Sequence, residues 1–179
     1  SLVPGDSDDA GSVLIIAPTS ITENWQRELD SWGKKNHHEW AVESWDRAAR
    51  MAREGTLGEW DLVILDESVM GKSRSSQRYK SFTKARSQWG RLWLLSGNPV
   101  TKYADDLWAQ LHLVWPKAFP SYWRFARRYC VVEETPWGDK VVGTRRNRNV
   151  MEENDDLVIV VNQRDVIDVP EFVFETVDC

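Results

Sequence analysis

Two adjacent carboxylates, Asp66 and Glu67, follow a short apolar run at residues 62–65. Neighbouring acids of this kind suit phosphate chemistry: the first holds Mg²⁺, usually through water, and the second orients and polarises the water that attacks a γ-phosphate. An apolar strand behind the pair would keep both side chains rigid at the rim of a sheet. An Asp-Glu pair taken alone is more often a solvated turn, so the rest of the sequence has to support the chemical interpretation.

Two further polar loops follow apolar runs. Thr19 and Ser20 come after the run at 13–17, and they offer hydroxyls and a helix N-terminus to a nucleic-acid phosphate. Ser96 comes after the run at 91–95 and could place a hydroxyl near the carboxylates, with Gly97 supplying backbone freedom when phosphate leaves. Ser20 as a plain helix cap and Gly97 as a plain turn are the simpler alternatives. The order of all three loops along one sheet is much harder to obtain by accident.

The elements that must position these loops alternate between strands and helices. Short apolar or β-branched runs predict strands, and apolar residues spaced three or four apart predict helices. Ser20 and Glu23 have the spacing of a capping box, and Asp46 is expected to cap the second helix. The predicted strands are 13–17, 40–44, 61–65, 91–95, 157–161 and 172–177; the predicted helices are 20–32, 47–53, 76–86, 105–114 and 122–129; a hairpin turn is predicted at 136–139.

This alternation predicts an α/β fold in three layers with a mainly parallel central sheet. In such sheets ligands bind at the carboxyl ends of the strands, which is where the three polar loops fall. The chain has 179 residues, of which 41% are hydrophobic and 28% charged, with a net charge of −5. This composition excludes disorder, collagen and a disulfide scaffold. Two cysteines favour a reducing intracellular setting, and no apolar run is long enough to span a membrane.

Charge is strongly segregated along the chain. Residues 68–104 carry bases and no acid, whereas residues 150–179 are acidic with Arg164 as their one base. A solvated helix face explains the basic stretch on composition alone, but local potential also allows a polyanionic partner. Eleven tryptophans could suggest stacking on bases or sugars, although most have helical spacing typical of a core. The eight bases are Lys72, Arg74, Arg78, Lys80, Lys84, Arg86, Arg91 and Lys102.

At this point the chain resembles superfamily-2 motors of the Swi/Snf type. Residues 14–20 with Asn24-Trp25 look like their motif Ia, residues 60–68 like motif II, and residues 94–99 like motif III. The similarity continues through 106–113, 125–130 and 164–170 and so covers nearly everything from 13 to 179. It implies a RecA-like domain of the P-loop NTPase type, namely the first, helicase ATP-binding lobe of an ATP-dependent double-stranded-DNA translocase. Residues 1–12 are then expected to be a flexible acidic and glycine-containing segment.

The resemblance also implies roles for individual residues. Asp66 would hold Mg²⁺, Glu67 would activate water, and Ser96, Gly97 and Asn98 would couple the nucleotide state to the grip on DNA. The implied cofactors are ATP and Mg²⁺, and the implied partners are double-stranded DNA and a second RecA-like lobe, with no membrane. The residues that fall where the family contacts the duplex, or carries a lysine after motif II, are Pro18, Thr19, Ser20, Asn24, Glu43, Ser44, Lys72 and Arg74.

Three departures from the family pattern matter. Val69 stands where the family usually has a histidine that links the nucleotide site to motif III, and Asn98 stands where it usually has threonine. The sequence also contains no Gly-x-x-x-x-Gly-Lys-Ser/Thr loop for the phosphates. Gly71-Lys72-Ser73 is a decoy because Asp66 occupies the place of the first glycine, and residues 88–91 only mimic an arginine-finger motif. The chain is therefore expected to be a piece of a larger protein and, alone, to hydrolyse almost no ATP.

Two alternatives stay open at this stage. A non-catalytic DNA-binding or scaffold module derived from such a lobe would explain Val69 and the missing phosphate loop. A related superfamily-2 machine, such as a restriction-enzyme motor subunit or an RNA helicase, is a third reading, although the long stretch after Asn98 fits the Swi/Snf type better. An intracellular location is expected, in a bacterial or phage-host cytoplasm or a eukaryotic nucleus.

Overall fold

The computed structural model of the chain describes residues 11–32 and 39–161. They belong to two compact units, 1–145 and 146–179. Among the described residues, no helix combines the length and the apolar character that crossing a membrane would need.

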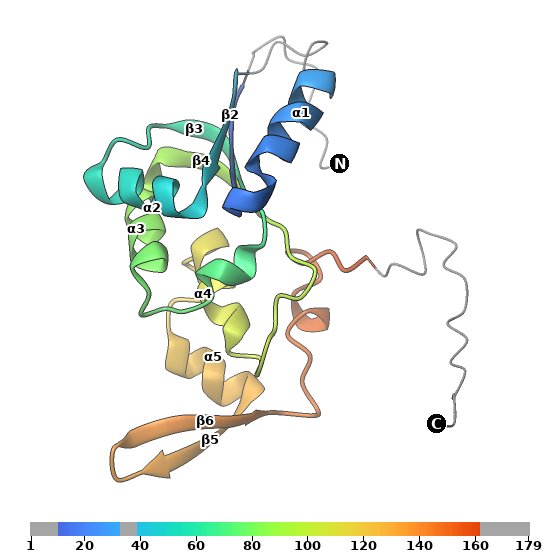
Figure 1. The fold of residues 1–179 in the computed structure, drawn as a ribbon. Coiled ribbons are helices and arrows are strands. Elements are labelled where there is room, and N and C mark those ends of the chain that lie inside the picture. The colour runs from blue at the N-terminus through green and yellow to red at the C-terminus, as the bar shows by residue number, and fades with distance from the viewer. Residues whose placement is uncertain (1–10, 33–38, 162–179) are drawn as a thin grey trace, which may run out of the picture. The chain divides into compact units, whose positions relative to one another are not determined.

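A four-stranded parallel sheet organises the first unit (Figure 1). Its strands are β1 (Ser12–Ala17), β2 (Glu39–Ser44), β3 (Trp60–Leu65) and β4 (Trp89–Leu94), in the spatial order β2-β1-β3-β4. All three pairings are parallel, and β1 pairs with both β2 and β3. The predicted α/β class and the four strands on which it rests are confirmed.

Helices cover both faces of this sheet. Side chains alternate along β1, so neighbouring residues of the strand pack against opposite helical layers. Ile15 and Ala17 pack beneath α1 (Thr22–Trp32), together with Trp25 and Leu29 of that helix. Leu14 and Ile16 point to the other face, into a core that includes α2 (Trp45–Glu54) and α3 (Gln77–Ala85). Residues 14–17 are all 0% exposed, as expected for a strand buried on both faces. The result is the three-layer arrangement that the sequence predicts.

The rest of the first unit consists of two helices and a hairpin. α4 (Asp106–Val114) and α5 (Tyr122–Tyr129) precede the antiparallel strands β5 (Cys130–Thr135) and β6 (Gly138–Thr144), which confirms the predicted turn around Trp137. Burial raises the pKa of the Cys130 thiol to about 11, so this buried side chain stays protonated. Short 3-10 turns occur at Thr19–Ile21, Ser68–Gly71 and Arg86–Gln88, and in the second unit at Glu152–Asn154.

Several local expectations differ from the structure. Ser44, not Asp46, caps α2, because the Ser44 hydroxyl accepts the hydrogen bond from Arg47 N. The chain makes a 3-10 turn at Thr19–Ile21 before α1 begins at Thr22, so Ser20 does not form the expected capping box. Residues 157–161 form no strand, and apolar character alone does not supply the neighbouring strand that a ladder requires. The strand predicted at 172–177 lies outside the described residues.

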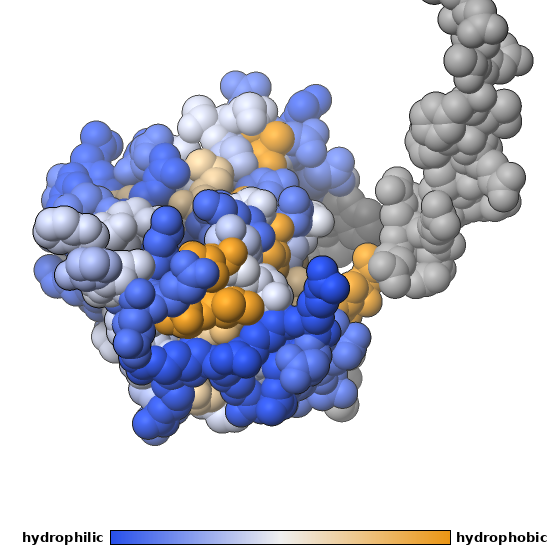
Figure 2. Space-filling model, turned by 90° about the horizontal axis from the view of Figure 1, so that it is seen from below, coloured by the Kyte–Doolittle hydropathy of each residue, from blue (hydrophilic) through white to orange (hydrophobic). Residues whose placement is uncertain are grey.

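The tryptophans divide between core and surface. Trp45, Trp89 and Trp108 are buried, whereas Trp93, Trp115 and Trp137 are exposed. Trp137, in the hairpin turn, is 96% exposed and therefore contributes nothing to a core. On the face seen in Figure 2, the largest group of hydrophobic residues lies near the centre, and most of the remaining surface is hydrophilic. Trp25, Trp40 and Trp60 are partly buried and pack against the core, so six of the eleven tryptophans agree with the expectation that most are core residues.

The close approach of β3 and β4 gives a stability prediction. A Cβ added at Gly90 in β4 would lie 2.7 Å from the Asp61 carbonyl oxygen, whereas a Cβ at Gly97 would meet no atom within 4 Å. We expect Gly90→Ala to lower the free energy of unfolding by about 1–3 kcal/mol, because one strand must move. Gly97→Ala, the matched control, should leave it unchanged or raise it by about 0.4–1 kcal/mol. Urea unfolding measures both variants. Equal losses would contradict the close approach of β3 and β4 at Gly90.

Candidate functional site

The three polar loops meet at the carboxyl-end rim of the sheet. Asp66 N donates a hydrogen bond to Ile16 O of β1 at 2.8 Å, which places the start of the acidic loop beside the end of β1. On the other side, Leu95 N donates to Leu65 O at 2.9 Å, and Ser68 N donates to Leu95 O at 2.8 Å. The acidic pair therefore sits between the loops that follow β1 and β4, in a turn rather than in a helix.

Two tryptophans fix Asp66 from the helical layers on either side of the sheet. Trp25 Nε1 of α1 donates to Asp66 Oδ2 at 2.7 Å, and Trp45 Nε1 of α2 donates to Asp66 O at 2.8 Å. The other carboxylate oxygen accepts a hydrogen bond from Glu67 N at 2.9 Å. Each oxygen of an ionised carboxylate has capacity for a further partner, so these contacts orient the group without saturating it.

The residues at this rim are compatible with a magnesium ion but do not enclose one. Within the described ranges, no group of three or more His, Cys, Asp or Glu side chains could hold a metal ion. Mg²⁺ is commonly held by one or two carboxylates, with waters and substrate phosphates completing its octahedron. A single oriented carboxylate at Asp66 suits that mode of binding.

Glu67 has an unusual backbone. Its φ of 50° and ψ of 52° lie in the left-handed region, and it is the only non-glycine residue with positive φ in the described part of the chain. For an L-residue with a Cβ this conformation costs about 1–2 kcal/mol. The turn leaves Glu67 exposed while its neighbour Ser68 is buried. Observed strain at a residue expected to do chemistry supports a functional role for that residue.

The backbone of the loop after β4 differs from the expectation at Gly97. Ser96 Oγ accepts a hydrogen bond from Asn98 N at 3.3 Å, which closes a small turn. Gly97 is exposed and is not among the glycines with positive φ. Gly97 therefore does not use the backbone freedom expected of it. Its φ is one that any L-residue can adopt.

The residues expected to contact nucleic acid near β1 lie together on the surface. Thr19, Ser20 and Asn24 are exposed, and Pro18 is half-buried at the end of β1. Asn24 Oδ1 accepts a hydrogen bond from Arg27 Nη2 at 3.4 Å, so a base also lies close to this group.

The two expected contacts at the end of β2 are engaged with α2. Glu43 forms an ion pair with Arg47, with 3.1 Å between Oε2 and Nε, and Ser44 is the helix cap. Their present contacts are structural, whereas Thr19 and Ser20 are open to solvent.

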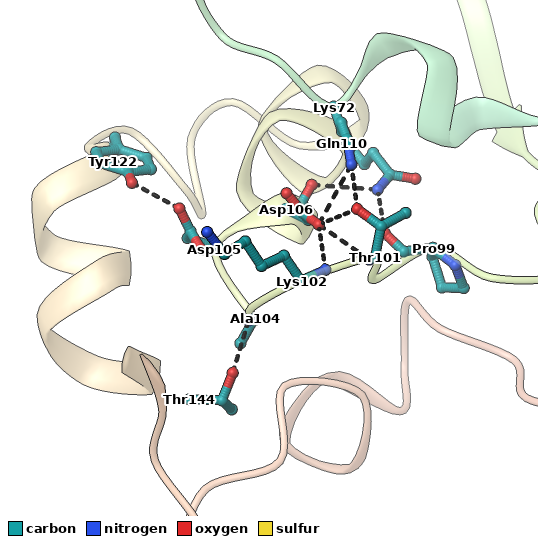
Figure 3. Close-up of polar contacts among 10 residues, drawn as sticks. All are labelled: Lys72, Pro99, Thr101, Lys102, Ala104, Asp105, Asp106, Gln110, Tyr122 and Thr144. Atoms are coloured by element: carbon teal, nitrogen blue, oxygen red, sulfur yellow. Dashed lines mark hydrogen bonds and ion pairs between the residues drawn. The ribbon is translucent and has the colours of Figure 1, made fainter. Parts of the chain in front are cut away.

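Lys72 and Arg74 are both engaged within the chain (Figure 3 shows the contacts of Lys72). Lys72 Nζ lies 3.6 Å from Asp106 Oδ2 and donates a hydrogen bond to Thr101 Oγ1. The Arg74 guanidinium lies 4.1 Å from the centre of the Tyr122 ring. Stacking leaves the in-plane N–H donors of an arginine accessible, whereas an ion-paired ammonium has fewer to offer.

The partners of these bases were not among the residues singled out from the sequence. Burial by itself would raise the pKa of Asp106, but hydrogen bonds from Thr101 and Lys102, with the charge of Lys72, lower it below its ordinary value. Burial, together with the hydrogen bond to Asp105, raises the pKa of Tyr122, which stays protonated and donates to Asp105 Oδ2 at 2.7 Å.

A buried glutamine is another residue that the sequence patterns did not indicate. Gln110 of α4 is 6% exposed, and its side chain contacts Ser68 and the Pro99 carbonyl (Figure 3 shows the latter contact). In the sequence it looks like one more position of an apolar helix, flanked by Ala109 and Leu111. Only the folded chain brings it next to the acidic loop.

Comparison with known proteins indicates the family of the chain. The family model described as SNF2-related domain matches residues 41–153. A chromatin-remodeling ATPase INO80 from Cryptococcus neoformans is 31% identical over an alignment 146 residues long, and the alignment covers 65% of this chain and 8% of that protein. The SWI/SNF-related matrix-associated actin-dependent regulator of chromatin subfamily A-like protein 1 from Xenopus tropicalis is 25% identical over an alignment 142 residues long, and the alignment covers 70% of this chain and 15% of that protein. The chain thus spans a small part of these curated relatives.

A solved structure has the same fold. The Sulfolobus solfataricus SWI2/SNF2 ATPase core, solved in complex with dsDNA, matches with a TM-score of 0.55 and 21% identity. The match covers 67% of this chain and 28% of that chain.

The left-handed backbone at Glu67 makes a testable prediction about stability. Glycine adopts this conformation without steric cost, so Glu67→Gly should be more stable than Glu67→Ala by about 1 kcal/mol. At Arg50, an exposed residue in the middle of α2, the order should reverse, with alanine favoured over glycine by about 1 kcal/mol. Urea unfolding of the four variants tests the crossover. If alanine were the more stable residue at both sites, Glu67 would not be left-handed in solution.

Proposed function

Because the chain belongs to the SNF2-related domain family, we propose that it is the first RecA-like lobe of an ATP-dependent motor that tracks along double-stranded DNA. One observation carries the proposal. Asp66 and Glu67 stand at the carboxyl-end rim of a parallel sheet, hydrogen-bonded between the loops that follow β1 and β4. This is the position in an open α/β sheet where ligands bind.

The chemistry divides between the two acids. Asp66, held by the indole of Trp25, is the side chain that would bind Mg²⁺. When bound, the ion neutralises negative charge on the phosphates of ATP. Glu67 is exposed beside it and orients the attacking water through its carboxylate. Ser96, Gly97 and Asn98, in the loop bonded to the acidic segment through Leu95, are the proposed link to the grip on DNA.

Turnover needs groups that these 179 residues do not contain. The sequence has no Gly-x-x-x-x-Gly-Lys-Ser/Thr loop to cradle the phosphates. In the proposal, residues 13–179 form the lobe, residues 1–12 lead into it, and a phosphate loop and a second RecA-like lobe complete the motor. The chain alone then hydrolyses almost no ATP. Such a motor works wherever the DNA is, in a eukaryotic nucleus or a bacterial or phage-host cytoplasm.

Duplex DNA is proposed to contact two surfaces of the lobe. The first is the exposed group at the end of β1, made of Pro18, Thr19, Ser20 and Asn24, with Glu43 and Ser44 at the neighbouring strand end. The second is the basic segment that contains Lys72 and Arg74. The guanidinium of Arg74, stacked on Tyr122, can bind phosphate through its in-plane N–H donors. Lys72 contributes mainly charge, because its ammonium is paired with Asp106. Both surfaces suit backbone tracking without base readout.

A second candidate function is a DNA-binding or scaffold module that has lost the chemistry. The specific observation in its favour is Val69, whose aliphatic side chain directly follows the Glu67-Ser68 turn and offers no hydrogen bond. The two candidates differ in what they predict for Glu67. A module without catalysis has no use for a strained acid at the rim, whereas a motor does.

Replacement of Glu67 by glutamine tests the motor. In the intact protein, Glu67→Gln should reduce DNA-stimulated ATP turnover by roughly 10²–10⁴-fold, because a positioned base is removed while shape and size are kept. DNA binding should be unchanged, as measured by fluorescence anisotropy of a labelled duplex. Glu59→Gln, outside the site, is the matched control. Normal turnover in Glu67→Gln would remove this residue from the mechanism and favour the scaffold alternative.

The salt dependence of duplex binding tests the basic segment. Arg74→Ala should weaken duplex binding and lower the slope of log K against log salt by about one, as expected for the loss of one phosphate contact. Lys72→Ala should lower the slope by less, because part of its charge is already neutralised by Asp106. Lys80→Ala on α3 is an exposed control with the same change of charge. An Arg74→Ala slope equal to that of the parent would show that this base is merely solvated.

A further inference from the structure

A buried side-chain bridge joins the acidic loop to the loop after β4. Ser68 Oγ donates a hydrogen bond to Gln110 Oε1 at 2.8 Å. Gln110 Nε2 in turn donates to Pro99 O at 3.0 Å and to Asp106 O at 3.2 Å. Ser68 is 3% exposed and Gln110 is 6% exposed, so both groups are shielded from water.

The orientation of the Gln110 amide is determined by its partners. The carbonyl oxygens of Pro99 and Asp106 only accept, so the NH₂ group must face them and Oε1 must face the Ser68 hydroxyl. One amide thus makes three hydrogen bonds in a buried site. Buried polar groups that are fully satisfied in this way specify a single arrangement of the elements they join.

Each end of the bridge lies next to a residue of the proposed site. Ser68 directly follows Glu67, and its own N–H is bonded to Leu95 O at the start of the loop after β4. Pro99 directly follows Ser96-Gly97-Asn98. Beyond Pro99, Thr101 N and Lys102 N donate to Asp106 Oδ2 and attach the rest of that loop to the start of α4 (Figure 3). The bridge therefore connects two loops that the proposed motor must move together.

The neighbouring residues of the acidic segment do not supply an equivalent buried connection. Val69, which follows Ser68, has no polar side-chain atom. Lys72 also links this segment to the start of α4, through the Asp106 carboxylate, but its side chain is only half-buried. Only the contact made by Ser68 is fully buried. Water competes least with such a contact, so a shift at one end is transmitted to the other.

We propose that Gln110 is a positioning residue that couples the Glu67-Ser68 turn to the Ser96–Pro99 loop, so that the state of the nucleotide site changes the grip on DNA. Gln110 touches no reacting atom in this role. The inference rests on the proposed function for its consequence in turnover, whereas the physical coupling of the two loops does not depend on that function.

Amide hydrogen exchange tests the coupling on the chain itself. Gln110→Leu, of similar size and without polar atoms, should speed exchange about tenfold or more in both 67–72 and 97–102, although only one side chain has changed. Gln88→Leu is the matched control, since Gln88 is exposed, and it should change neither segment. Faster exchange in one segment alone would overturn the proposal, because the two loops would then respond independently.

Turnover of the intact protein tests the consequence. Gln110→Leu should lower the ratio of DNA-stimulated to unstimulated ATP turnover about tenfold, within the usual range for coupled sites, with little change in KM for ATP. Ser68→Ala/Gln110→Leu removes both side-chain partners, so its stability should partly recover, while the ratio should stay low. Recovery of the ratio together with stability would reduce Gln110 to a structural role. If the parent protein shows no DNA stimulation, the proposed function fails, and the exchange experiment still decides whether the bridge couples the loops.

Discussion

The hydrogen bond from Asp66 N to Ile16 O is the contact on which the site depends. It extends the β1–β3 ladder one residue beyond Leu65, so Asp66 is the last residue that the sheet holds directly. Two residues later, Ser68 N is bonded to Leu95 O on the β4 side. Glu67 therefore lies between two residues whose N–H groups are both bonded, Asp66 to the end of β1 and Ser68 to the residue after β4. At Glu67 the backbone turns from the β1 side of β3 to the β4 side. A left-handed conformation at Glu67 is the geometry with which the chain makes this crossing.

This anchoring explains how strain can persist at a non-glycine residue. A cost of about 1–2 kcal/mol is small compared with the contacts on both sides, which include two indole donors on Asp66 and the buried hydroxyl of Ser68. Glycine would remove the strain but would also remove the carboxylate. A glutamate at this strained position is what a site that needs an exposed acid beside a fixed one would require. In the proposed motor, stability and chemistry would make opposite demands on this position.

Much of the fold could be predicted because its signals are local. Residues 63–65, the buried end of β3, could be predicted because they are apolar and are followed by polar residues, and the four parallel strands place the polar loops at one rim. The cap of α2 was misassigned because Asp46 and Ser44 are both good caps, and only the backbone shows which precedes the first helical turn. Residues 157–161 were misassigned because a strand needs a partner that its own sequence does not specify. Gln110 was missed because its importance depends on Ser68, 42 residues away.

The basic stretch shows why charge counted along a sequence differs from charge available to a partner. Several of its eight bases are engaged with other groups of the chain, among them Arg74 on the Tyr122 ring. Lys72 pairs with Asp106, Arg78 pairs with Asp46 at 2.7 Å, and the Arg86 guanidinium donates to the Leu113 and Trp89 carbonyls. Arg86 in particular acts as a cap for backbone acceptors rather than as a surface charge. A count of bases along the sequence therefore overstates the charge that is open to a partner, because several of these side chains are already engaged. Arg74 differs from the paired bases because stacking on Tyr122 leaves the N–H donors at the edge of its guanidinium accessible.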